Sequence, residues 1–266
     1  MIEAFRAELL KLRGRSAAWV LATMVAFSVL ATALVFATAG NSTSMFSGGR
    51  PGAVSVSLPG LAQASGPTRG FVIGAGFAGV VMLVLFAVSF AGEYSHGTLA
   101  NLLLAQPRRL RVLAGKTGAL LVLLTTGFLL AEIAGIATAF VMAQIQGVST
   151  SAWIGVDGLR ATVSAFGDTV LAGAGWAMLG MVAAVLLRSV PIALAVALAW
   201  VFPFENILHN AWASADKWMP GLLLQGLGAG TGSSVRWTRA GLVLLVYVAI
   251  LAGTASMSFS RRDVTA

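Results

Sequence analysis

The sequence predicts an all-α integral membrane protein with six transmembrane helices in a single domain, residues 1–266. Apolar residues make up 58% of the chain and charged residues only 10%, and the mean hydropathy is +0.90. Soluble domains average roughly 45–50% apolar and about 25% charged residues, so this composition does not fit a water-soluble fold. The apolar residues form six runs, each near or above the roughly 20 residues that cross a bilayer. The predicted spans are residues 17–39, 71–91, 113–143, 166–187, 192–208 and 240–259.

The segment before the first span, residues 1–15, predicts an amphipathic helix on the inner membrane surface. Its large apolar side chains fall within an arc of about 80° when each residue advances about 100°, and its basic residues lie largely outside that arc. The apolar set is Ile2, Phe5, Leu9 and Leu12. The alternative is a charged tail. The first span has about 23 residues, more than the roughly 7–15 of a cleaved signal peptide, and is interpreted as retained.

Three segments between the spans are predicted to lie outside the membrane on one side. They are residues 40–69, 144–164 and 209–238, and the glycines between 226 and 232 predict a loop in the last of them. Pro203 and Glu205 are expected to interrupt the outer end of the fifth span, because proline removes a backbone donor from a helix.

A polar segment, residues 93–112, separates the second and third spans. Glu93 closes the preceding helix, Gly97 allows a sharp turn, and Thr98 can cap a new helix by accepting a hydrogen bond from a free amide. Apolar residues then recur at i, i+3 and i+4, which predicts a short helix; they are Leu99, Leu102 and Leu103. Pro107 ends this helix and suits the first position of the next one. Basic residues follow at Arg108, Arg109, Arg111 and Lys116.

This segment resembles the coupling-helix region of type-2 ABC transporter permeases. The resemblance rests on the order of Glu93, the Gly97-Thr98-Leu99 turn, the Leu102-Leu103 pair, Pro107 and the basic Arg108 and Arg109. The six spans and the N-terminal surface helix fit the same family. In that family the loop docks into a groove on a separate ATPase subunit. The resemblance therefore implies two ATPase subunits, which carry ATP and magnesium, and a second permease chain, either identical or different.

The chain itself carries no ATPase motif. Gly115-Lys116-Thr117 is similar to the end of a phosphate-binding loop, but position 110, where that pattern requires glycine, is leucine. Cysteine is absent, and His96 and His209 lack metal-ligand spacing, so we predict no cofactor or metal bound by this chain and no enzymatic activity of its own. The net charge of +8 comes from the ends of apolar runs, which does not predict nucleic-acid binding.

The distribution of basic residues predicts the orientation. With both termini in the cytoplasm, 11 Lys and Arg residues lie inside and 6 outside, as the positive-inside rule requires. With the family resemblance, this predicts a multi-pass protein of the bacterial cytoplasmic membrane. Arg108, Arg109 and Arg111 either pair with acids on the ATPase or contact anionic membrane lipid, and the two alternatives stay open.

Two acidic residues in the spans are candidates for a substrate path. Glu132 lies among apolar residues of the third span, where a charge costs roughly 2.5–3.5 kcal/mol. It either lines the substrate route or forms an ion pair with Arg69 or Arg160. Glu205 either shapes the exit at the interrupted fifth helix or is a helix-end acid near the headgroups.

Two tryptophans complete the candidate path. Trp176 and Trp200 either form an aromatic surface for an amphipathic substrate or face lipid and neighbouring helices. Taken together, the sequence predicts the permease subunit of an ATP-driven exporter, coupling ATP hydrolysis on a separate subunit to efflux of a drug, lipid or peptide. The alternatives are a proton-coupled secondary transporter that uses Glu132 and a membrane sensor or anchor that binds an ATPase. An integral-membrane enzyme is disfavoured, because no nucleophile, metal ligands or paired acids converge.

Overall fold

The structure is a computed structural model that describes residues 14–39, 56–95, 109–212 and 214–228, with short pieces between 242 and 253. Within these ranges the chain is almost entirely helical and has no β-strand. Five helical segments of the described part are long and apolar enough to cross a membrane: Ala17–Thr38, Gly66–Gly92, Val112–Gln146, Val156–Leu187 and Val190–Ala211. The prediction of an all-α protein with several membrane-type helices is confirmed. Residues 1–13 lie outside the described part, and the described residues of the sixth predicted span are helical.

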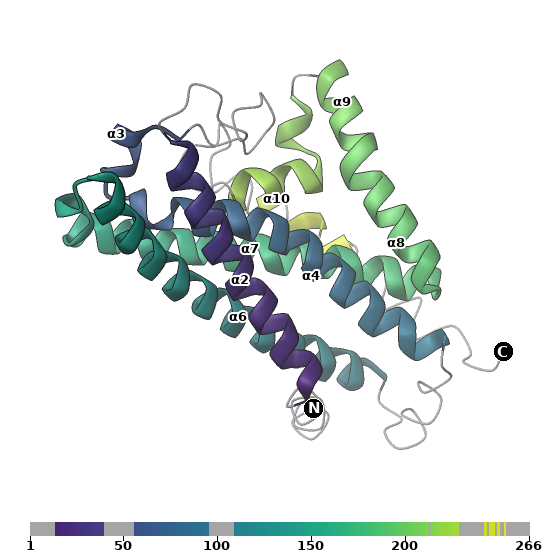
Figure 1. The fold of residues 1–266 in the computed structure, drawn as a ribbon. Helices are drawn as coiled ribbons and strands as arrows, with labels where there is room; N and C mark the ends of the chain where they lie inside the picture. The colour runs from purple at the N-terminus through teal and green to yellow at the C-terminus, as the bar shows by residue number, and fades with distance from the viewer. Residues whose placement is uncertain are drawn as a thin grey trace.

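Four long helices pack side by side. They are α2 (Arg15–Thr38), α4 (Arg69–Ser95), α6 (Arg109–Gln146) and α7 (Val156–Leu187). The next helix, α8 (Val190–Ala199), continues through a π-helical turn, Trp200–Phe204, into α9 (Glu205–Ala211). Figure 1 shows α8 and α9 as one rod along an edge of the bundle. We call the end of the bundle at Ser95 and Arg109 the α4–α6 end, and the opposite end the far end.

The main core lies between α4, α6 and α7 and is built from large apolar side chains. Phe71, Phe86 and Phe128 are fully buried in it. Small residues bring the helices into close contact: a Cβ atom at Gly180 of α7 would overlap the carbonyl of Leu83 in α4. Close approach of helix backbones at glycine is the usual way in which membrane helices pack, because burial against lipid gives little net hydrophobic gain.

The far end is more structured than the sequence indicated. Residues 56–68, part of the predicted loop 40–69, include the short helices α3 (Leu58–Leu61) and η1 (Gly66–Thr68). Trp153 holds this region together, because its indole Nε1 donates a 3.0 Å hydrogen bond to the Leu61 carbonyl and its ring packs edge-on against Phe36 and Phe140. A second small core results, separate from the main one.

The predicted outer segment 144–164 is helical over much of its length. Helix α6 continues to Gln146, and α7 already begins at Val156. A helix of 32 residues is about 48 Å long, whereas the hydrocarbon core is about 30 Å thick. Helix α7 is thus longer than a single crossing requires, and Asp157 in its first turn suits the positive helix N-terminus.

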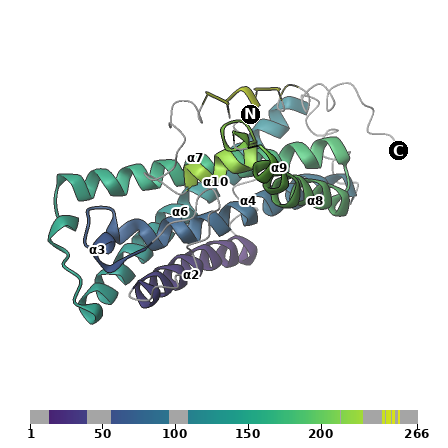
Figure 2. The same ribbon diagram turned by 90° about the horizontal axis from the view of Figure 1, so that it is seen from above.

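The loop predicted at the glycines between 226 and 232 needs correction at its start, because residues up to Gly228 are helical. Helix α10 (Pro220–Gly228) is buried along its length and contributes Leu223, Leu224 and Leu227 to the main core. Leu224 packs so closely on α7 that a Cβ atom at Gly175 would overlap it. Figure 2 shows α10 between α7 and α9, with α2 on the opposite side of the bundle. Two of the glycines that predicted a loop, Gly226 and Gly228, lie in the last turn of this buried helix.

Candidate functional site

Glu205 is a fully buried carboxylate that caps α10. Its Oε1 accepts a 3.1 Å hydrogen bond from the Gly221 amide, and its Oε2 accepts a 2.8 Å bond from the Leu222 amide. Pro220, the first residue of α10, has no N–H group, so the carboxylate takes the first two amides available. A carboxylate at a helix N-terminus is also stabilised by the helix dipole. Glu205 thus lies inside the bundle and holds the start of α10.

The backbone around Glu205 contains the predicted irregularity. Residues Trp200–Phe204 form a π-helical turn, and the Glu205 amide bonds to the Trp200 carbonyl five residues earlier. This wider turn accommodates Pro203, which cannot donate a backbone hydrogen bond. The helix rod continues through the turn without breaking, and isolated π turns of this kind are frequent at functional sites.

The two candidate tryptophans do not share a surface. Trp176 is 3% exposed and packs against α4 where a Cβ atom at Gly79 would overlap its ring. Trp200 is 47% exposed and stacks on Phe204, with ring centroids 4.6 Å apart. A substrate that contacted both rings would have to reach from the outside of the bundle into its core. Only Trp176 lies beside the interior groups described next.

Glu132 is buried in α6, and no described residue forms an ion pair with its carboxyl group. It is 4% exposed, and its Oε1 atom has no hydrogen-bond partner among the described residues. Arg69 and Arg160 are both described, and neither forms the ion pair that the sequence left open as an alternative. A buried polar atom without a partner costs roughly 1–3 kcal/mol, and more when charged, so this carboxyl needs a functional explanation.

A second unpartnered polar atom lies at the level of Glu132. Thr169 of α7 is 2% exposed, and its Oγ1 also has no hydrogen-bond partner. The two helices run antiparallel and touch where the Phe128 ring fills the space that a Cβ atom at Gly173 would need. Glu132 lies one helical turn after Phe128 in α6, and Thr169 lies one helical turn before Gly173 in α7. Because the helices are antiparallel, both steps lead toward the far end. The register therefore brings both groups to one level of the core.

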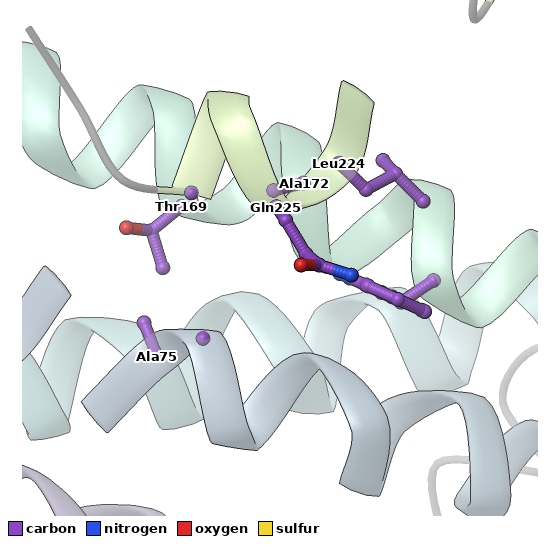
Figure 3. A pocket seen from close by; sticks show the side chains of 8 residues that line it. Ala75, Thr169, Ala172, Leu224 and Gln225 are labelled. Carbon is purple, nitrogen blue, oxygen red and sulfur yellow. The ribbon is translucent and has the colours of Figure 1, made fainter. Parts of the chain in front are cut away.

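Thr169 also lines a small cavity between α4, α7 and α10. The cavity measures about 20 Å³, room for about one water molecule. Figure 3 shows Thr169 and Gln225 projecting toward α4 on either side of this space. Its lining residues are Ala75, Gly76, Thr169, Ala172, Trp176, Leu224, Gln225 and Gly228. Helix α10, held by Glu205, thus forms one wall of a cavity that a polar side chain enters.

Lys116 occupies the α4–α6 end of the bundle. It is 5% exposed, its Nζ donates a 2.7 Å hydrogen bond to the Ser89 carbonyl, and it lies 5.0 Å from the centroid of the Phe90 ring. Both partners belong to the last turns of α4. The sequence grouped Lys116 with Arg108, Arg109 and Arg111 as a run of basic residues; the structure places Lys116 inside the bundle, where it ties the start of α6 to the end of α4.

Most of the predicted coupling residues lie outside the described part. These are Gly97, Thr98, Leu99, Leu102, Leu103, Pro107 and Arg108. Glu93 is in the last turn of α4, and Arg109 is the first residue of α6. The segment 96–108 is therefore flanked directly by the two helices that Lys116 joins.

Three features of the site escaped the sequence interpretation: the unpartnered Thr169, the cap on α10 and the clamp by Lys116. Of these, only the position of Lys116 could have been predicted from the sequence, because it is a charged residue followed by a long apolar run. Within the described ranges no three His, Asp or Glu residues lie close enough to hold a metal ion. No protein-family model matches the chain, and no curated protein matches it either.

Proposed function

We propose that this chain is the membrane-spanning permease subunit of a bacterial ATP-driven exporter, and that residues 93–112 couple it to a separate ATPase subunit. The observation that carries the proposal is the Lys116 clamp. Because Lys116 bonds to the Ser89 carbonyl and lies over Phe90, a force applied to residues 96–108 would reach α4 and α6 as one unit. The resemblance of the same segment to type-2 ABC permeases supports this assignment.

Close helix contacts would carry that movement to the far end. Helix α4 meets α7 without spare volume at Leu83 and Gly180, and α7 meets α10 in the same way at Gly175 and Leu224. Cores at this packing density switch between discrete arrangements and do not deform smoothly. A shift of α4 would therefore displace α7 and, with it, the wall that α10 contributes to the cavity at Thr169.

In this proposal the two ATPase subunits hold ATP and magnesium, and a second permease chain, the same or different, completes the transporter. Both termini lie in the cytoplasm, and the basic residues after Pro107 meet either ATPase acids or anionic lipid. The cargo is an amphipathic molecule such as a drug, lipid or peptide. Glu132 lines its route, because it is buried and forms no ion pair within the described ranges, and α10 borders the exit.

Copurification tests the coupling segment. We expect an ATPase to copurify with the tagged wild-type chain in mild detergent, and to be lost from the Leu102→Asp/Leu103→Asp variant, because two charges on the apolar stripe prevent docking. The Asn101→Asp/Ala105→Asp variant carries the same added charge on the opposite side of the predicted helix and should retain the ATPase. If stable wild-type protein brings down no ATPase, or if both variants behave alike, the proposed coupling is wrong.

A second candidate function is proton-coupled secondary transport, which the unpartnered carboxyl of Glu132 favours. Intramembrane acids of this kind commonly serve as proton relays. Transport into proteoliposomes that hold only this chain, driven by a proton gradient without ATP, would support it. Transport that strictly requires the ATPase and ATP would exclude it.

A further inference from the structure

We infer that Glu132 and Thr169 form an internal site for the positively charged nitrogen of an organic cation, so that the cargo class is a protonated amine with an apolar body. This inference rests on the proposed transport function, for which it names the cargo chemistry. It starts from the two buried polar atoms without partners, Glu132 Oε1 and Thr169 Oγ1, which the helix register places at one level of the core.

Among the described residues, no cation pairs with the Glu132 carboxyl group. Arg69 and Arg160, the cations considered for Glu132, form no ion pair with it in the described structure. A buried carboxylate is tolerated only when it is paired and hydrogen-bonded. A protonated amine supplies both needs, because its N–H groups donate to the carboxylate while its charge neutralises it. The Thr169 hydroxyl can accept a further N–H bond.

The surroundings suit the apolar part of such a molecule. Phe128 precedes Glu132 by one helical turn. The ring of Phe71 in α4 packs edge-on against the Phe128 ring, with the two ring centroids 6.4 Å apart. Phe71 also reaches the position one turn beyond Glu132, because a Cβ atom at Gly135 would lie 3.4 Å from its Cβ. Aromatic rings beside a carboxylate attract organic cations through their negative faces. An anionic cargo would meet repulsion from Glu132 here.

The cavity beside Thr169 is too small for an organic cation unless the helices around it move. At about 20 Å³, the space beside Thr169 admits a water molecule but not an amine with an aromatic body. Its walls come from α4, α7 and α10, the helices that the proposed mechanism displaces. The organic cation therefore enters when α10 and α7 move apart from α4.

Two probes of nearly equal shape test the charge preference. Binding of 4-phenylbutylammonium and of the uncharged 4-phenylbutan-1-ol is measured by calorimetry on the purified full chain in nanodiscs, with whatever ATPase it retains. We expect the wild type to bind the ammonium at least about tenfold more tightly than the alcohol, as expected where a charge pair is desolvated. Equal binding of the two probes, or no binding of the ammonium, would overturn the inference.

Variants then assign the preference to this site. Glu132→Gln, which is nearly isosteric, should weaken ammonium binding about tenfold or more and leave alcohol binding nearly unchanged. Glu132→Asp keeps the charge and should retain the preference, while Thr169→Val should weaken ammonium binding by about tenfold, the loss of one hydrogen bond from a charged donor. Asp157→Asn removes an exposed acid from the start of α7 and should change nothing. An unaltered preference in Glu132→Gln would contradict the site.

The outcomes separate this inference from the proposed function. If the ammonium preference depends on Glu132 but no ATPase copurifies with the chain, the cation site stands and the ATP-driven mechanism falls. If the ATPase copurifies and depends on Leu102 and Leu103 but the probes bind alike, the exporter assignment stands and the cargo class is wrong.

Discussion

Replacing Glu205 with leucine is expected to release α10 from the core and to lower the free energy of unfolding by about 2–5 kcal/mol, since each orphaned buried amide costs roughly 1–3 kcal/mol. The variant leaves the Gly221 and Leu222 amides, which now bond to the carboxylate, without an acceptor in an apolar region. It also removes the negative charge from the N-terminus of α10. Thermal unfolding in mild detergent measures the loss of stability.

The position of α10 can be followed in the same variant. The chain has no cysteine, so a single Leu223→Cys substitution in a fully buried position reports whether thiol reagents reach α10. We expect protection with Glu205 present and rapid labelling in Glu205→Leu. Gly221→Ala gives an independent comparison, because its Cβ would lie 2.7 Å from Glu205 Oε2 and must push the carboxylate away. Equal protection in all three proteins would show that the cap does not hold α10.

The spans could be predicted because hydropathy is a property of single helices. A stretch of about 20 apolar residues must be helical in lipid, where every backbone group needs an internal partner. The limits of the helices could not be predicted in the same way. Helix α7 begins at Val156, ten residues before the predicted span, because a helix that leaves the bilayer no longer needs apolar residues.

Helix α10 shows a different limit of sequence analysis. A nine-residue helix with three glycines has little stability of its own, because short helices are marginal in isolation. It forms here because its leucines enter the core and Glu205, sixteen residues before Gly221, supplies the cap. The leucines were visible in the sequence, but the partner that turns them into a buried helix is a tertiary contact.

The candidate site was predictable only where a residue was unusual in its own segment. Glu132 stood out as a charge in an apolar run, whereas Thr169 did not. Threonines in membrane helices normally bond to the carbonyl four residues earlier, as Thr32 and Thr125 do. That Thr169 lacks this bond depends on its side-chain rotation and its neighbours in α4 and α10, which the sequence does not contain.

Replacing Lys116 with methionine is expected to uncouple the two helices that flank residues 96–108. The variant keeps an unbranched apolar chain of similar length but loses the bond to the Ser89 carbonyl and the charge over Phe90. A hydrogen bond from a charged group contributes roughly 1.5–3 kcal/mol, so the population in which α4 and α6 move together should fall about tenfold or more. We expect ATP hydrolysis by the purified complex to continue while the amount of cargo moved per ATP falls about tenfold.

The ratio of transport to hydrolysis distinguishes coupling from simple stability. A variant that is merely less stable loses both activities in proportion, whereas loss of the clamp lowers only the ratio. Lys116→Arg retains charge and donors and should preserve part of the ratio, although the planar guanidinium does not reproduce a point charge. Lys217→Met removes a lysine distant in sequence from the clamp, in the turn before α10, and should leave the ratio unchanged. If Lys116→Met transports with the wild-type ratio, force does not pass through this contact, and α4 alone must carry the movement to α7 through the close packing at Leu83 and Gly180.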